Sequence, residues 1–139
     1  MQRLATRLNA WPNFTTDIDD LSIHFLHIRS SHADAVPLLL THGWPGSVVE
    51  FLNVIGPLSE PDQHGADGTQ AYHLIIPSLP GYGFSGKPTA TGWSTQQTAK
   101  AWAKLMARLG YDSYFAQGGD WGAGVTSEIA KQNLGNCLG

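Results

Sequence analysis

One short segment, Ser113–Gly124, constrains the fold of this chain more than any other. An aromatic and apolar run ends there at a pair of glycines, and Asp120, Trp121 and a helical pattern follow at once. A strand that turns so sharply into a helix strains the backbone at the turn, and a Cβ on the neighbouring residues would clash. Gly118 and Gly122 remove those clashes. We therefore expect the turn to lift the Asp120 carboxylate off a sheet, where the positive end of the following helix favours its anionic form.

This layout is that of a nucleophile elbow, with Asp120 in the position where esterases carry serine. A carboxylate that attacks an sp3 carbon forms an alkyl-enzyme ester, which water must then hydrolyse. Epoxides and alkyl halides are the usual electrophiles for that two-step scheme. The alternative is a glycine-rich turn in which Asp120 only caps the helix, a common use of aspartate.

A second motif follows a predicted buried strand, Val36–Thr41, and reads His-Gly-Trp-Pro-Gly-Ser over residues 42–47. In α/β-hydrolases the loop after the third strand supplies one backbone N–H of an oxyanion hole, and the residue after the nucleophile supplies the other. Here those donors would be the amides of Trp44 and Trp121, which would hold the oxyanion formed when water attacks the ester. Two motifs in the right order, each at a strand end, argue against the helix-cap alternative.

With both motifs, the chain resembles the epoxide hydrolases of the α/β-hydrolase superfamily, most closely the microsomal-type branch with its extra N-terminal segment. The matching segments are RLNAWPNFTTDIDDLSIHFLHIRS, PLLLTHGWPGSVVEFLNVIGPL, HLIIPSLPGYGFSGKP and YFAQGGDWGAGVTSEIAKQ. HGWPGS with GGDWG is specific to epoxide hydrolases and their close relatives, whereas PSLPGYGFS occurs across the superfamily. The resemblance implies an α/β fold. Residues 1–35 would hold the C-terminal part of the N-terminal segment and the first strands. Residues 36–139 would form the first half of the α/β-hydrolase core, a mainly parallel sheet with flanking helices that ends just after the elbow helix.

The resemblance also implies an activity, the hydrolysis of an epoxide to a vicinal diol through an ester on Asp120. A small apolar epoxide and water would be the partners, with no cofactor and no metal. The family further uses an acid and a histidine after the nucleophile and two tyrosines in a cap, but only Glu128 and no histidine follows Asp120 here. We therefore expect this chain alone to be inactive or limited to the alkylation half-reaction. Besides Asp120 and the Trp44 and Trp121 amides, the implied site has structural support from His42, Gly43, Pro45, Gly118, Gly119 and Gly122.

Two other functions remain open. Haloalkane dehalogenases also carry Asp followed by Trp at the elbow, and there the Trp121 indole N–H would bind the leaving halide. The loop after His42-Gly43 argues against them, because they favour a different residue set there than Trp-Pro-Gly-Ser. The third possibility is a non-catalytic truncated remnant, which the absent histidine and cap favour.

Composition excludes several other classes. A net charge of −3 leaves no basic footprint for nucleic acid. The single cysteine, Cys137, excludes an internal disulfide. No apolar run reaches membrane-spanning length and Met1–Ala10 has no signal-peptide core, so we expect a cytoplasmic protein. His42 is predicted to hold loop backbone near the oxyanion hole. The other five histidines show no metal-ligand spacing with partner carboxylates, so they are interpreted as surface or satisfied histidines.

Local patterns place the remaining elements. Alternating residues around Asp19-Asp20 predict a hairpin. Ser47 with Glu50, and Ser94 with Gln97, have the spacing of capping boxes at the start of two helices. The last predicted strand lies at the edge of the sheet, without a further strand to pair its backbone. The expected elements are a helix within Met1–Asn13, strands at Phe14–Ile18, Ser22–Arg29, Leu38–Thr41, Tyr72–Ile76 and Tyr114–Gln117, and helices after Ser47, after Ser94 and over Ala123–Asn133.

Overall fold

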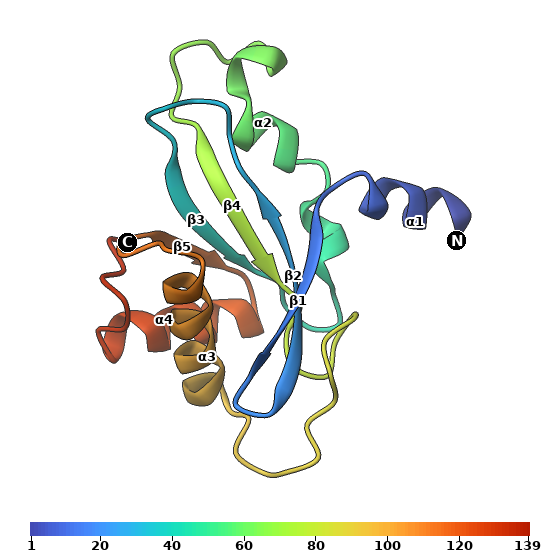
Figure 1. The fold of residues 1–139 in the computed structure, drawn as a ribbon, viewed down its shortest axis with the longest axis vertical. Helices are drawn as coiled ribbons and strands as arrows, with labels where there is room; N and C mark the ends of the chain where they lie inside the picture. The colour runs from blue at the N-terminus through green and yellow to red at the C-terminus, as the bar shows by residue number, and fades with distance from the viewer.

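The computed structural model describes residues 1–139 as one five-stranded sheet with helices on both faces (Figure 1). The strand order is β1-β2-β4-β3-β5. The pairs β3/β4 and β3/β5 are parallel, whereas β1/β2 and β2/β4 are antiparallel, so the sheet is mixed and its parallel part is the half that carries the two motifs. The elements are α1 (Gln2–Asn9), β1 (Asn13–Ile18), β2 (Leu21–Ile28), β3 (Val36–Thr41), η1 (Val48–Phe51), α2 (Ile55–Ser59), η2 (Pro61–His64), β4 (Tyr72–Pro77), α3 (Thr95–Arg108), β5 (Phe115–Gly118) and α4 (Trp121–Lys131).

The predicted N-terminal hairpin is confirmed. Its turn consists of Asp19 and Asp20, which have φ of 51° and 63°. Two successive residues in the left-handed region match the twist of a two-residue hairpin, and aspartate tolerates that region better than most residues. Strand β2 then pairs with β4, so the sheet runs across the predicted boundary between residues 35 and 36.

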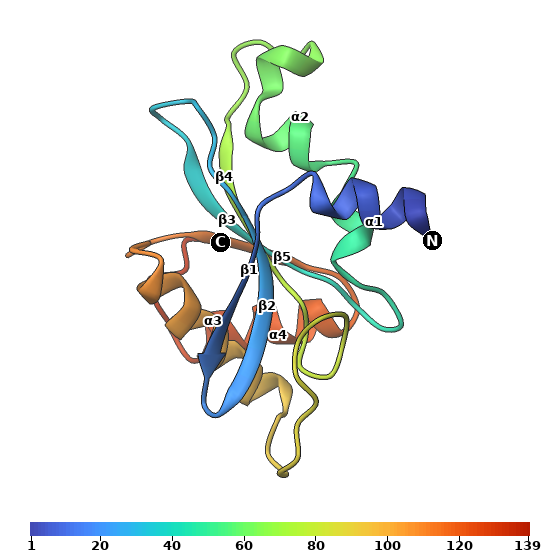
Figure 2. The ribbon, with the colours of Figure 1, turned by 45° about the vertical axis from the view of Figure 1, so that its right-hand side comes forward.

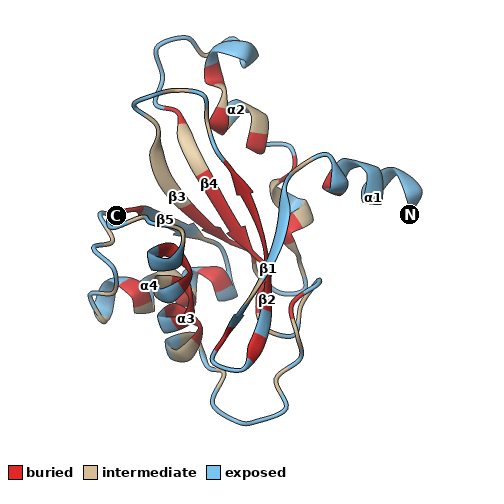
Figure 3. Ribbon diagram, viewed as in Figure 1, coloured by how far each residue is buried: buried red, intermediate tan, exposed pale blue.

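Two apolar layers form because alternate residues of each strand point to opposite faces. Figure 2 shows α1 and α2 on one side of the sheet and α3 and α4 on the other, and Figure 3 shows buried residues along the central strands. Ile23 and Phe25 of β2 pack on the side covered by α3 and α4. Leu26 and Ile28 of the same strand pack on the side covered by α1, η1 and α2. The central strands are therefore buried on both faces, which explains their continuous apolar sequence.

The helix predicted after Ser47 is wrong as a single element. Ser47 does cap a helical turn, since its side chain accepts a hydrogen bond from the Val49 N–H. That turn is the short 3-10 helix η1, and the α-helix α2 begins only at Ile55. Pro57 gives the reason, because inside one continuous helix it would lack its N–H and clash with the carbonyl four residues earlier. In the first turn of a new helix, Pro57 sacrifices no helical hydrogen bond and meets no such carbonyl.

Neither predicted capping box is complete. The Glu50 carboxylate accepts a hydrogen bond from the Gly43 N–H instead of returning to Ser47. At α3, the Ser94 hydroxyl accepts from the Gln97 N–H at 3.3 Å, but the Gln97 side chain donates to Asp19 at 2.7 Å. Lys104 of α3 also pairs with Asp19. The polar side chains that local spacing assigns to helix caps therefore hold separate parts of the chain together.

Strand β5 lies at the edge of the sheet as predicted, but its outer side is partly paired. Residues 137–139 run parallel to it, with a bridge between Tyr114 and Cys137. The Ala116 N–H donates to the Gly139 carbonyl at 2.8 Å, and the Leu138 N–H donates to the Tyr114 carbonyl at 2.8 Å. No helix of the structure has the length and apolar character needed to span a membrane.

Candidate active site

The two motifs meet at the carboxyl ends of neighbouring parallel strands. Thr41, the last residue of β3, is in register with Gly118, the last residue of β5. The loop after β3 and the turn into α4 therefore start side by side. The Trp44 N–H donates to Asp120 Oδ2 at 2.8 Å across 76 residues of sequence. The chain thus brings together the predicted nucleophile and one of the two predicted oxyanion-hole donors.

Backbone strain at Asp120 is that of an elbow. Its φ of 54° and ψ of −118° lie outside the regions that residues with a side chain usually adopt. Such strain persists only where the surroundings enforce it, and it is concentrated at functional sites. Helix α4 starts at the next residue, so the Asp120 carboxylate lies at its positive end.

Close packing explains the glycines on either side of the turn. A Cβ on Gly122 would lie 2.1 Å from the Thr41 carbonyl oxygen, and one on Gly118 would lie 2.3 Å from the Gly122 backbone. A Cβ on Gly43 would lie 2.6 Å from the Asp120 Cβ. Gly119 differs, because a Cβ there would meet nothing within 4 Å. Its predicted supporting role therefore has no steric basis in this structure.

Hydrogen bonding polarises the Asp120 carboxylate. The Trp44 amide, and next the Trp121 amide, lower the pKa of this carboxyl below its usual value, against a smaller opposing effect of desolvation. Oδ2 accepts the Trp44 hydrogen bond. The group is exposed, and so are the Trp44 and Trp121 side chains, at 63% and 57%. The two amides thus favour the anionic form of an exposed carboxylate that is held through Oδ2.

His42 lies beneath the loop and is 1% exposed. Its Nδ1 is 3.0 Å from the Gly43 carbonyl oxygen, which can only accept, so Nδ1 carries the proton. Its Nε2 accepts from the Leu79 N–H at 3.0 Å, and its ring meets Tyr82 edge to face. Burial lowers the pKa of His42, which favours the neutral ring that these contacts need. With both nitrogens engaged, His42 links two loops, as the predicted supporting role requires.

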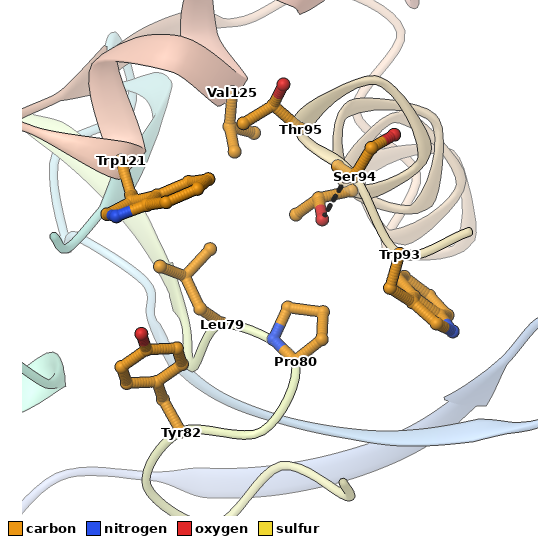
Figure 4. Close-up of a pocket in the computed structure, with 9 residues that line it drawn as sticks. Leu79, Pro80, Tyr82, Trp93, Ser94, Thr95, Trp121 and Val125 are labelled. Atoms are coloured by element: carbon orange, nitrogen blue, oxygen red, sulfur yellow. Dashed lines mark hydrogen bonds between the residues drawn. The ribbon is translucent and has the colours of Figure 1, made fainter. Parts of the chain in front are cut away.

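Two hollows flank Asp120. An open cleft of about 480 Å³ contains Asp120 itself, and its walls come from the loop after β3 and from Glu50, Phe51 and Gln117. Pro45, with the exposed Trp44, forms the rim of this cleft. A narrower cavity of about 180 Å³ lies on the far side of Trp121 (Figure 4). It is lined mainly by apolar and hydroxyl side chains, namely Leu79, Pro80, Tyr82, Trp93, Ser94, Thr95, Thr98, Trp121 and Val125.

Sequence reasoning missed two contributors to this region. Glu50 was assigned to a helix cap, yet its carboxylate lies in the cleft with Asp120. Trp102 is fully buried in the core, and its indole N–H donates to the Thr41 hydroxyl at 3.1 Å. Trp102 and Thr41 are 61 residues apart, and the spacing of Glu50 from Ser47 matches a helix cap. The residue pattern therefore predicts neither contact.

The interpretation of the remaining histidines is correct for the buried ones. His24 is hydrogen-bonded to Ser78 and Asn13, and His27 to Tyr111. The expected absence of carboxylate partners is wrong for the half-buried His32.

His32, which precedes β3, lies beside Glu60 and Asp62 at η2. Their ligand atoms fall within 4.8 Å of one another because the loop after β2 and η2 reach the same end of the sheet. The His32 Nε2 is 2.7 Å from the Asp62 carboxylate, and hydrogen bonding to Asp62 raises the pKa of His32. When His32 is protonated, it therefore forms an ion pair with Asp62.

Known proteins resemble the chain over most of its length. Residues 36–135 match the family described as alpha/beta hydrolase fold, and residues 2–51 match the family described as epoxide hydrolase N terminus. A candidate epoxide hydrolase of Stigmatella aurantiaca is 58% identical over 129 residues, which are 93% of this chain and 29% of that protein. Epoxide hydrolase 1 of Oryctolagus cuniculus is 42% identical over 128 residues, 89% of this chain and 28% of that protein.

A solved structure shows the same arrangement. The juvenile hormone epoxide hydrolase of the silkworm Bombyx mori superposes with a TM-score of 0.88 at 41% identity, covering 99% of this chain and 32% of that one. The chain thus spans less than a third of the length of these relatives.

The chain belongs to the alpha/beta hydrolase fold family. Within that family, the resemblance to epoxide hydrolases that the HGWPGS and GGDWG motifs predict is confirmed.

Proposed function

We propose that this chain carries the nucleophile of an epoxide hydrolase and that Asp120 is the residue that attacks the epoxide. One observation carries the proposal: the Trp44 N–H binds Asp120 Oδ2 at 2.8 Å, at a strained turn, and the exposed carboxylate lines the cleft. A nucleophile fixed through one oxygen is aimed through the other, which lowers the entropic cost of reaction. The epoxide hydrolases among its relatives support the electrophile.

The first step forms an ester. Oδ1 bonds to one epoxide carbon while the bond from that carbon to the ring oxygen breaks, and the alkoxide takes a proton from water or from a donor in the cleft. Ring opening neutralises the Asp120 charge, so the reaction needs a carboxylate that is ionised beforehand. The lowered pKa of Asp120 meets that requirement.

The second step returns the carboxylate. Water adds to the ester carbon, the negative charge moves onto Oδ2, and the bond to the alkoxy oxygen then breaks to release a diol. The Trp44 and Trp121 amides would stabilise the charge on Oδ2, because the Trp44 N–H already binds that oxygen in the resting state and both amides lower the pKa of the carboxyl. This step also needs a base for the water. His42 is unsuited to it, since both of its nitrogens are engaged, so we expect the ester to accumulate on this chain.

The substrate would be a small apolar epoxide. Trp44 and Trp121 expose their rings on both sides of Asp120, and Figure 4 shows the Trp121 ring reaching into the cavity opposite Leu79 and Pro80. Apolar walls with a few polar groups are typical of small-molecule sites.

The expected cytoplasmic location stays a prediction, which cell fractionation would test.

Mass spectrometry of the intact chain tests the assignment. After incubation with styrene oxide, we expect a gain of one epoxide mass on a peptide that contains Asp120, and no such gain in Asp120→Asn protein. Glu128→Gln, which changes a carboxylate on α4 that contacts Lys131 and Gln132, should label like the unaltered chain. Equal labelling of the Asp120→Asn variant would overturn the assignment. Release of bromide from a bromoalkane, without labelling by the epoxide, would favour the dehalogenase alternative.

A further inference from the structure

Glu50 reaches back over the loop that carries the Trp44 amide. Its Oε1 accepts the Gly43 N–H at 3.3 Å, seven residues earlier in the chain. The Glu50 side chain passes directly over Gly46, where a Cβ would lie 2.9 Å from Oε1. Glu50 and Asp120 line the same cleft, with Gly43 between them, since a Cβ on Gly43 would lie 3.0 Å from Asp120 Oδ2.

The orientation of the Trp44 N–H depends on how Gly43 is held. The Gly43 carbonyl accepts from the Gly46 N–H at 2.9 Å and from His42 Nδ1 at 3.0 Å. In a trans peptide the carbonyl and the following N–H point in opposite directions. Two donors on the Gly43 carbonyl therefore aim the Trp44 N–H away from them and toward Asp120. The Gly43 N–H is the remaining polar group of this residue, and Glu50 alone supplies its acceptor.

We infer that Glu50 is a positioning residue, whose carboxylate holds Gly43 so that the Trp44 N–H stays directed at Asp120 Oδ2. The inference rests on the proposed function for the roles of Asp120 and Trp44. Glu50 accepts its hydrogen bond from the Gly43 N–H and contacts no reacting atom. Its effect on chemistry is exerted through the geometry of the loop.

If Glu50 acted on Asp120 through its charge and not through the loop, its loss would shift the Asp120 pKa in the opposite direction. A titration of Asp120 therefore separates the two roles. Losing a nearby negative charge stabilises the Asp120 carboxylate and lowers its pKa. Losing the Trp44 hydrogen bond destabilises that carboxylate and raises its pKa. The groups that face Asp120 are the two amides and Glu50, while His42 lies below the loop.

Carbon-13 NMR titration of the Asp120 carboxyl decides between these roles without requiring turnover. We expect Glu50→Ala to raise the Asp120 pKa by about half a unit or more and to move the Trp44 amide resonance. Glu50→Gln keeps an acceptor oxygen and removes the charge, so it should leave the pKa unchanged or lower it. Glu128→Gln is the matched control for loss of an acidic side chain elsewhere. A pKa that falls equally in Glu50→Ala and Glu50→Gln would overturn the inference.

A second variant displaces Glu50 without removing it. Gly46→Ala would push the carboxylate off the loop, because the new Cβ would lie 2.9 Å from Oε1. We expect the same rise in the Asp120 pKa as for Glu50→Ala, so the test stands even if one variant fails to fold. An unchanged pKa in a folded Gly46→Ala chain would count against the inference.

Labelling by styrene oxide gives the link to activity. Glu50→Ala should label several-fold more slowly, and Glu50→Gln should recover most of the rate. If no variant, nor the unaltered chain, is labelled, the proposed function fails while the titration still reports on Glu50. If labelling proceeds and Glu50→Ala is as fast as the unaltered chain, the positioning role fails alone.

Discussion

The indole N–H of Trp102 donates a hydrogen bond to the Thr41 hydroxyl at 3.1 Å, and both residues are fully buried. Trp102 lies in the middle of α3, and Thr41 is the last residue of β3. The contact therefore fixes a helix to the strand end from which the loop toward Asp120 departs. A bond inside the core is in this way connected to the geometry of the cleft.

Trp102→Phe should destabilise the chain by about 1–3 kcal/mol, because it leaves the buried Thr41 hydroxyl without a partner and removes part of a large ring. Chemical denaturation followed by circular dichroism measures the change. In the double variant Thr41→Val/Trp102→Phe no orphaned hydroxyl remains, so its loss should be smaller than the sum of the two single losses. Strict additivity would show that the hydrogen bond contributes nothing.

The elbow glycines give a matched pair. Gly122→Ala places a Cβ 2.1 Å from the Thr41 carbonyl oxygen, which is backbone and cannot move aside. We expect a loss of about 3 kcal/mol or more, or failure to fold. Gly119→Ala, three residues earlier, meets nothing within 4 Å and should stay within about 1 kcal/mol of the parent. Comparable losses in both variants would mean that α4 does not approach β3 as described.

Local steric rules explain why the sequence predicts the elbow so well. The requirement for glycine at residues 118 and 122 arises from the turn itself, so spacing alone reveals it. The same holds for the hairpin, whose two aspartates supply the left-handed turn. The meeting of Trp44 with Asp120 follows from two strand ends in a parallel sheet, and therefore from the fold class.

Prediction from sequence fails for the hydrogen-bond partners of side chains that can bind either a nearby or a distant group. Glu50 and Gln97 have the spacing of a capping box, yet each finds a partner outside its own helix, at Gly43 and Asp19. A spacing rule considers only the backbone groups within a few residues and not the partners that the fold brings close. The ion pair of His32 with Asp62 likewise depends on two loops reaching one end of the sheet, which no window of sequence contains.

Buried histidines should make stability fall in mild acid. Burial, then Arg29 and His73, lowers the pKa of His27 from its usual 6.5, and burial lowers the pKa of His24 and His42 too. As the pH falls below 6.5, the unfolded chain therefore binds more protons at these histidines than the folded chain does. This stability is present above pH 6.5, declines below it, and is lost as pH falls through the folded-state pKa values.

Urea midpoints at pH 7.5 and 5.5 measure this dependence, and the midpoint should be lower at pH 5.5. His27→Gln offers the cleanest comparison, because only one ring nitrogen of His27 is hydrogen-bonded, to the Tyr111 hydroxyl at 2.8 Å. The variant should show a smaller change between the two pH values. A midpoint that rises on acidification would contradict the assignment of neutral histidines to the folded state.

The reaction of Asp120 should persist to lower pH than that of an ordinary aspartate. The Trp44 and Trp121 amides lower its pKa, and the anion is the nucleophile, so protonation should slow labelling only below the usual value near 3.9. The rate of epoxide labelling, corrected for the folded fraction, should therefore be flat from pH 7 to about 4.5. Gly43→Ala would push the loop from Asp120, since its Cβ would lie 2.6 Å from the Asp120 Cβ. Its labelling should decline at higher pH than in the parent, whereas Gly119→Ala should follow the parent. Identical profiles for Gly43→Ala and the parent would show that the amides of this loop do not set the ionisation of Asp120.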